Sequence, residues 1–389
     1  MSKSYLAEHV KGLQPSGIRK FFDLASKMDN VISLGVGEPD FVTPWNVIEA
    51  SYHSLEQGYT AYTANAGLLE LREEISKYLE ETFSVSYNPE DQILVTVGAS
   101  QAIDVALRTI VNRGDEVIVV EPCFVSYGPA IELAGGVPVS VSATAENEFK
   151  VTPQQIESAI TPKTKAIVIC SPNNPTGAVL SKEELTAIAT VVEKHDLVVL
   201  SDEIYAELAY DGPATSFASI EGMKEHTIVL SGFSKSFAMT GWRLGFATGP
   251  TEIMQAMTKI HQYTIMCAPT MAQHGALEAL RNGNDSVREM KTSYQQRRNF
   301  VVKALNEMGL SCHLPGGAFY VFPSIKATGY SSEEFAQKLL EEERVAVVPG
   351  HVFGESGEGY IRCSYATSIK QLDEAMKRIS RFVKQNSKV

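Results

Sequence analysis

The sequence predicts an α/β protein with a mostly parallel sheet covered by helices, plus a smaller α+β part. Two observations carry this prediction. Short, continuous apolar runs alternate with amphipathic segments in the middle of the chain, and polar or aromatic residues follow every run. Fully apolar strands are typical of parallel sheets that are buried on both faces. The predicted strands are residues 93–97, 117–120, 166–169, 197–200 and 228–230.

Helical patterns lie between several of these runs and again near the C-terminus. Residues 101–112 and 181–195 are amphipathic, and Ser181-Lys-Glu-Glu184 has the spacing of a capping box. Later patterns predict helices over residues 284–308, 332–343 and 369–385, and a strand over 316–322. We expect an N-terminal arm with part of the small domain (1–44), a large domain (45–285) and a small C-terminal domain (286–389).

Composition excludes several classes of protein. The 389 residues are 44% hydrophobic and 21% charged, and the net charge of −12 disfavours nucleic acid as a partner. No apolar run approaches the roughly 18 residues of a membrane span, and residues 1–9 lack the apolar core of a signal peptide. The five cysteines form no CxxC pair, and the histidines are scattered. We therefore expect a cytoplasmic protein without disulfides, a metal site or a membrane partner.

Lys235 is the first candidate functional residue. It follows the apolar run 227–230, lies among small residues and hydroxyls, and precedes Arg243 by eight positions. A lysine amine attacks carbonyl groups when burial or neighbouring cations lower its pKa. Lys235 is thus a candidate for a covalent bond to an aldehyde. The same stretch also fits a strand end followed by a surface loop.

The segment after the first predicted strand favours an anion. Gly98-Ala-Ser-Gln101 at a helix start would offer free backbone N–H groups and the positive end of the helix dipole, which suit a phosphate. Ser100 and Ser234 add hydroxyl donors, and Arg243 adds a full charge. An ordinary N-cap is the alternative interpretation of this segment.

Asp202 ends an apolar strand, where a buried carboxylate needs a cationic or N–H partner. A protonated ring nitrogen would serve. The alternative is that Asp202 caps the start of a helix. Tyr205 and Asn174 can donate to a phenolic oxygen, and Phe124 offers a flat face for ring stacking. A phosphate, a ring nitrogen, a phenolic oxygen and an aldehyde are the functional groups of pyridoxal 5′-phosphate, which is therefore the predicted cofactor.

Several ordered motifs resemble those of one enzyme family. Gly232-Phe-Ser-Lys235-Ser-Phe-Ala-Met-Thr-Gly-Trp-Arg243-Leu-Gly245 resembles the lysine signature of the class I/II aminotransferases, fold type I of the pyridoxal-phosphate enzymes. Pro172-Asn-Asn174-Pro-Thr-Gly and Ser201-Asp202-Glu-Ile-Tyr205 are similar to two further motifs. The resemblance runs from Leu34-Gly-Val-Gly-Glu-Pro-Asp40 to Arg362-Cys-Ser-Tyr365, and is strongest to bacterial aspartate, aromatic and N-acetyl-diaminopimelate aminotransferases.

The resemblance implies roles around the cofactor. Lys235 would hold pyridoxal phosphate covalently and then move a proton between the substrate Cα and C4′ of the cofactor. Asp202 would keep the pyridine nitrogen protonated, and Tyr205 would bind the phenolic oxygen together with Asn174. Phe124 would stack on the ring. The implied phosphate ligands are Ala99, Ser100, Ser234, Arg243 and, from a partner subunit, Tyr62.

The resemblance also implies substrate contacts and a homodimer. Arg362 would bind the α-carboxylate through its fork, helped by Asn174 and the backbone N–H of Gly37. A surface salt bridge is the alternative for Arg362. Arg19 would meet a distal carboxylate in an N-terminal segment that closes over the substrate, or would cap a helix. Tyr62 implies active sites shared between two subunits.

The implied reaction moves the amino group of an L-amino acid to a 2-oxo acid, 2-oxoglutarate above all, by ping-pong kinetics. The amino donor stays open among aromatic, aspartate-like or alanine-like amino acids and N-acetyl-L,L-diaminopimelate. Ser100 stands where some dicarboxylate-specific relatives carry a lysine, which disfavours aspartate. A C–S β-lyase on the same fold and a cofactor-binding domain without turnover are the alternative functions. The complete set of motif residues disfavours the latter.

Overall fold

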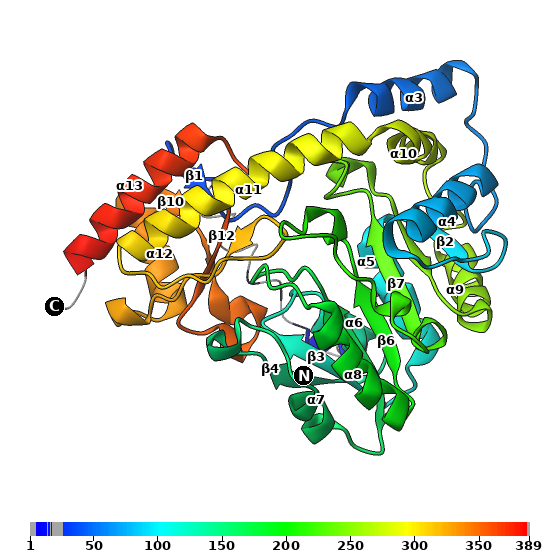
Figure 1. The fold of residues 1–389 in the computed structure, drawn as a ribbon, viewed down its shortest axis with the longest axis horizontal. Coiled ribbons are helices and arrows are strands. Elements are labelled where there is room, and N and C mark those ends of the chain that lie inside the picture. The colour runs from blue at the N-terminus through cyan, green and yellow to red at the C-terminus, as the bar shows by residue number, and fades with distance from the viewer. Residues whose placement is uncertain (1–4, 14, 16, 18–25, 387–389) are drawn as a thin grey trace.

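A computed structural model describes residues 5–13, 15, 17 and 26–386. In that part of the chain, seven strands form the largest sheet (Figure 1). Neighbouring strands from β7 to β4 run parallel, and β8 is antiparallel to both of its neighbours. The spatial order is β2 (Ile93–Thr96), β8 (Gly245–Thr248), β7 (Thr227–Gly232), β6 (Val198–Asp202), β5 (Thr164–Cys170), β3 (Glu116–Glu121) and β4 (Val137–Ser142).

The apolar runs predicted as strands are confirmed, and each lies in this sheet. Two strands of this sheet escaped the sequence analysis. β4 is an edge strand whose alternating Val, Pro and Ser residues are largely exposed or half-buried, so it has no continuous apolar run. β8 is buried but short, and it begins with a glycine.

Helices cover both faces of the sheet. One face carries α5 (Gly98–Ile110), α6 (Tyr127–Leu133) and α9 (Thr251–Thr264). The other carries α4 (Leu69–Phe83), α7 (Pro153–Ala159), α8 (Lys182–His195) and α10 (Thr270–Asn282). α3 (Trp45–Glu56) lies against α10 (Figure 1). The predicted capping box of α8 is confirmed, because Ser181 N–H donates to Glu184 and Glu184 N–H donates to Ser181 Oγ.

A second group of elements is built mainly from the last third of the chain. β1 (Ile32–Ser33) pairs in parallel with β10 (Val345–Ala346), while β12 (Ile361–Ser364) lies between β11 (Val348–Pro349) and β9 (Tyr320–Val321) in an antiparallel sheet. The helices are α11 (Asn284–Glu307), α12 (Ser332–Glu343) and α13 (Ile369–Asn386), and a short α1 spans Glu8–Lys11. Figure 1 shows α11 running from beside α10 to α13.

The helices predicted in this region are confirmed, but the strand predicted over residues 316–322 is too long. Only Tyr320 and Val321 form β9. Ala318 takes a φ of 58°, which interrupts an extended strand.

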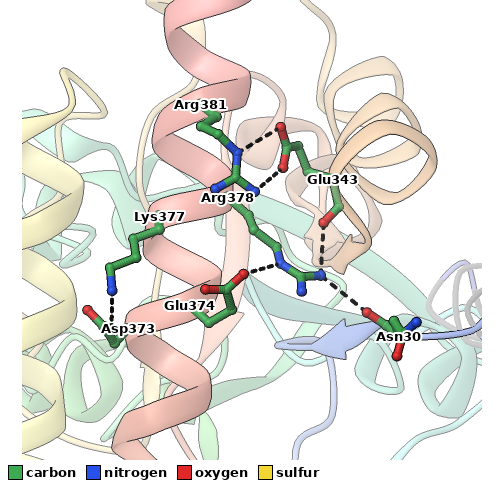
Figure 2. Close-up of polar contacts among 7 residues, drawn as sticks. All are labelled: Asn30, Glu343, Asp373, Glu374, Lys377, Arg378 and Arg381. Carbon is green, nitrogen blue, oxygen red and sulfur yellow. Dashed lines mark hydrogen bonds and ion pairs between the residues drawn. The ribbon is translucent and has the colours of Figure 1, made fainter.

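Arg378 on α13 ties three segments together (Figure 2). Its Nη1 donates to the backbone oxygens of Asn30 and Glu343, both at 3.2 Å, and its Nε donates to Glu374 at 2.8 Å. Asn30 lies just before β1 in the chain and Glu343 just before β10, so these contacts hold the two paired strands against α13. β1 leads directly into residues 34–37, which border the candidate active site.

Within the described residues, no helix is long and apolar enough to cross a membrane. The same residues contain no group of three or more His, Cys, Asp or Glu side chains arranged to hold a metal ion. All five cysteines are free. The domain boundaries at residues 44 and 285 and the cytoplasmic location stay predictions.

Candidate active site

A pocket of about 250 Å³ opens at the carboxyl ends of the parallel strands. Asp202 closes β6, and Lys235 follows β7 by three positions. Ligands of open α/β sheets bind at this edge. β9 and β12 complete the walls with Tyr320 and Arg362. The other predicted residues that line the pocket are Gly37, Ala99, Ser100, Phe124, Asn174, Tyr205, Ser234 and Arg243.

Lys235 lies on the pocket wall, where its Nζ donates to the backbone oxygen of Gly37 at 2.7 Å. Burial lowers the pKa of this amine to about 8; Glu38 opposes the shift, and Arg362 and Arg243 add to it. Such an amine has a neutral, nucleophilic fraction near neutral pH. Gly37 thus meets Lys235 through its carbonyl group, and the role predicted for its N–H stays a prediction.

Asp202 is buried and lines the pocket. Tyr127 Oη donates to its Oδ2 at 2.5 Å, and the N–H of Ile204 donates to Oδ1 at 3.2 Å. Burial raises the pKa of the carboxyl, whereas both hydrogen bonds and Lys235 lower it. A cation beside Asp202 would therefore offset the energetic cost of burying its ionised carboxylate. Sequence reasoning missed Tyr127, although it ends the segment 121–127 that follows a predicted strand.

Tyr205 and Tyr320 are buried and share a hydrogen bond of 2.9 Å between their hydroxyl oxygens. Burial raises the pKa of both hydroxyls, so both stay protonated at neutral pH. Phe124 packs edge-on against Tyr127, with ring centroids 5.7 Å apart. The sequence analysis assigned Tyr205 and Phe124, but it included Tyr320 only as part of a strand.

Arg362 is buried, so the surface salt bridge considered as its alternative role is wrong. Its Nη1 donates to Asn174 Oδ1 at 2.9 Å and its Nη2 to the Gly35 oxygen at 2.6 Å. The rings of Tyr320 and Phe353 lie 4.5 and 4.9 Å from the guanidinium carbon. Arg362 Nε has no hydrogen-bond partner within the described residues. A buried fork with an unused N–H suits an incoming carboxylate.

The start of α5 lies directly beside the side chain of Arg243. Gly98 has a φ of 77°, and a Cβ there would lie 2.7 Å from Arg243 Nη2, so glycine permits the close approach. No side chain caps α5, which makes the ordinary N-cap interpretation wrong and leaves its first N–H groups available. Ala99, Ser100 and Ser234 line the same pocket.

One predicted residue, Tyr62, is not brought into this pocket in its own chain. Tyr62 is 78% exposed and lies outside the set of residues that line the pocket in its own chain. Arg19 lies outside the described residues, so its contribution stays a prediction.

The model of the family described as "Aminotransferase class I and II" matches residues 29–379 of this chain. The chain belongs to this family. It is 65% identical over 98% of each chain to "Putative aminotransferase YugH" of Bacillus subtilis. It is 46% identical to aromatic-amino-acid aminotransferase 2 of Thermococcus litoralis, over 99% of this chain and 100% of the relative. The solved aspartate aminotransferase of Thermus thermophilus with maleate is 39% identical with a TM-score of 0.93, over 97% of this chain and 100% of that one.

Aminotransferases of this family are fold type I enzymes that use pyridoxal 5′-phosphate. The pocket of this aminotransferase fits that cofactor in three respects. Lys235 offers an amine of lowered pKa, and the buried Asp202 accepts its hydrogen bonds from neutral donors and would gain from a cation. Arg243 and the uncapped start of α5 suit a phosphate.

Proposed function

We propose that this aminotransferase moves the amino group of an L-amino acid to 2-oxoglutarate in two half-reactions that share one pocket. The observation that carries the proposal is a Lys235 amine of lowered pKa in one pocket with the buried Asp202 and Arg362. One pocket with one acid/base amine favours ping-pong kinetics, in which the first product leaves before the second substrate enters.

Lys235 and Asp202 act on different groups: Lys235 on the aldehyde of the cofactor and the substrate Cα, and Asp202 on the pyridine nitrogen. Lys235 would hold pyridoxal phosphate through Nζ, and its free amine would carry the proton that moves between the substrate Cα and C4′. The cofactor supplies the electron sink that stabilises negative charge at Cα. Asp202 keeps the pyridine nitrogen protonated, because a neighbouring carboxylate favours the charged form of a base.

The remaining contacts orient the cofactor and the substrate. Tyr205 donates to the phenolic oxygen. Asn174 donates to it as well, because its NH₂ group carries the donors that a phenolic oxygen needs, while its Oδ1 accepts from Arg362. Phe124 stacks on the ring. Arg362 binds the α-carboxylate with its free Nε–H and with an N–H that the bonds to Asn174 and Gly35 leave unused.

Phosphate binding draws on backbone and side-chain donors. In our proposal, Ala99 contributes its N–H at the start of α5, Ser100 and Ser234 contribute hydroxyls, and Arg243 contributes charge. Tyr62 of a second copy completes the set. Exposed aromatic residues on α3, on α9 and in the loop that carries Tyr62 support a dimer: Trp45, Tyr52, Tyr59 and Tyr263 are each more than half exposed.

Complementation tests the shared site. In a heterodimer of Lys235→Ala and Tyr62→Ala chains, one pocket keeps both Lys235 and a partner's Tyr62, whereas the other pocket loses both. Co-expression should therefore restore up to about half of the wild-type activity per heterodimer, while each variant alone stays impaired. Failure to restore activity in a purified heterodimer, or a monomeric mass in light scattering, would contradict the dimer proposal.

For the amino donor we favour an aromatic or alanine-like amino acid over aspartate; N-acetyl-L,L-diaminopimelate remains a candidate. Among the described residues that line the pocket, the cations are Lys235, Arg243 and Arg362, and each already has a role. The distal carboxylate of any dicarboxylic substrate, 2-oxoglutarate included, would need a further cation, for which Arg19 is the candidate from the sequence. Against aspartate as the donor stands Ser100, which occupies the position where some dicarboxylate-specific relatives carry a lysine.

The decisive experiment is optical and kinetic. Wild-type protein with pyridoxal phosphate should absorb at roughly 360–430 nm and lose this band when an amino donor is added. Lys235→Ala should stay colourless, and Lys303→Ala on the exposed surface of α11 should behave as wild type. A donor panel with 2-oxoglutarate then ranks substrates. A colourless wild type would refute the proposal, and pyruvate with ammonia formed without any acceptor would identify a β-lyase instead.

A further inference from the structure

Tyr320 touches three parts of the pocket, yet no role proposed above uses it. Its hydroxyl oxygen lies 2.9 Å from that of Tyr205, and its ring faces the guanidinium of Arg362 at 4.5 Å. A Cβ on Gly37 would lie 2.6 Å from Tyr320 Oη, so the backbone that accepts from Lys235 runs directly beside this hydroxyl. Tyr320 itself is 1% exposed.

The hydrogen bond between the two tyrosines has a direction once Tyr205 acts on a ligand. Either hydroxyl can donate in the structure. Tyr205 has a single proton, and if that proton goes to a phenolic oxygen, Tyr320 has to donate to Tyr205. A hydroxyl that accepts a hydrogen bond becomes a better donor, because bonds in a chain polarise one another. The raised pKa of Tyr320 keeps its proton available at working pH.

The ring of Tyr320 has a second effect. Arg362 lies against two aromatic rings, since Phe353 is 4.9 Å from the same guanidinium carbon. These contacts and the bonds to Asn174 and Gly35 fix the plane of the fork. A fork held in one plane loses little entropy when it binds a planar carboxylate.

We propose that Tyr320 is a positioning residue with two separable parts. Its hydroxyl aims the proton of Tyr205 at the phenolic oxygen of the cofactor, and its ring fixes the plane of Arg362 for the α-carboxylate. This inference rests on the function proposed above and assigns that pocket a residue that the sequence motifs did not indicate.

Tyr320→Phe tests the hydroxyl, because it keeps the ring. We expect kcat to fall about 3- to 10-fold, the value of one hydrogen bond, with KM for both substrates changed less than about twofold. The pH midpoint at which the absorbance of the bound cofactor changes should rise. Without Tyr320 the Tyr205 hydroxyl is a weaker donor to the phenolic oxygen, so it stabilises the deprotonated form of the cofactor less. This titration needs no turnover, and a merely structural role would leave its midpoint unmoved.

Tyr320→Leu tests the ring. Beyond the effects of the Phe variant, KM for the amino donor and for 2-oxoglutarate should both rise roughly 30-fold, the size of a desolvated cation–π contact. Both substrates are affected because both present an α-carboxylate to Arg362. If the Leu variant fails to fold, the Phe variant still tests the hydroxyl.

Tyr210 provides a matched control outside the pocket. It is buried, its ring lies 4.8 Å from the Arg298 guanidinium, and its hydroxyl lies 3.2 Å from that of Tyr365. Tyr210→Phe and Tyr210→Leu should leave the absorbance midpoint and both KM values unchanged. If they reproduce the effects of the Tyr320 variants, or if Tyr320→Phe leaves midpoint and kcat unchanged, the Tyr320 proposal falls. A wild type without cofactor absorbance would instead refute the proposed function.

Discussion

Tyr127 donates a hydrogen bond of 2.5 Å to Asp202, between a residue at the start of α6 and the last residue of β6. The pair is buried, and Tyr127 gives the strongest of the interactions that oppose the raised pKa of the carboxyl. The hydroxyl of Tyr127, a neutral donor, thus stabilises the ionised form of Asp202. That arrangement leaves the carboxylate charge available to the ring nitrogen of the cofactor.

Tyr127→Phe should raise the pKa of Asp202 and weaken its hold on a protonated ring nitrogen. Hydrogen bonds to charged groups are worth 1.5–3 kcal/mol, so we expect kcat to fall roughly 10- to 100-fold. Steady-state kinetics and a cofactor-binding titration measure the effect. Tyr78→Phe is the control, because Tyr78 Oη donates to the carboxylate of Glu207 at 2.7 Å away from the pocket. Equal losses in both variants would contradict a specific role.

Arg362→Lys should raise KM for both substrates by about 100-fold, because lysine keeps the charge but loses the planar fork. Lysine also cannot keep the bonds to both Asn174 and the Gly35 oxygen. The control is Arg298→Lys, a buried arginine that donates to Pro315 outside the pocket. Unchanged KM values in Arg362→Lys would exclude it as the carboxylate ligand.

Capture of pyridoxal phosphate by the cofactor-free protein should depend on pH through Lys235. Only the neutral amine attacks an aldehyde, and the pKa of Lys235 is lowered to about 8. The second-order rate, followed by absorbance, should rise about tenfold per pH unit below 8 and level off above about 9. A rate that still climbs toward pH 10.5, as for an exposed lysine, would disprove a lowered pKa.

Glu203 should make stability depend on pH. It accepts hydrogen bonds at Oε1 from Ser201, Ser216 and the N–H of Phe217, and burial raises its pKa from 4.5 to about 7. The folded protein therefore binds this proton more tightly than the unfolded chain does. The stabilising contribution is complete below pH 4.5 and is lost as pH rises through about 7.

Glu203→Gln removes this titration and keeps an Oε1 that accepts the same donors. Between pH 5 and 8, the wild type should lose up to about 3 kcal/mol of unfolding free energy relative to the variant, as urea denaturation can measure. Parallel pH curves for the two proteins would show that Glu203 does not titrate in this window. Glu225→Gln provides a control in the short η4 helix (Lys224–His226).

Local pattern predicted much of this fold. The capping box of α8 and the strands that end at Asp202 and before Lys235 were correct, since apolar runs and cap spacing act over a few residues. Local pattern failed at β4, an edge strand without an apolar run, and at β9, where Ala318 adopts a positive φ. The residues next to β4 in the sequence do not show that it lies at the edge of the sheet, and the residues next to Ala318 do not show that it adopts a left-handed conformation.

The sequence by itself determined the family, the cofactor, and most polar residues of the pocket, because strand ends deliver them and ordered motifs mark them. Only the tertiary structure decided which of them touch. Tyr320 meets Tyr205 across 115 positions and Arg362 meets Asn174 across 188, so these pairings depend on how β9 and β12 pack over the sheet edge. The pKa of Lys235 follows from the same packing, since burial is a property of the whole fold and not of the residues beside it in the chain.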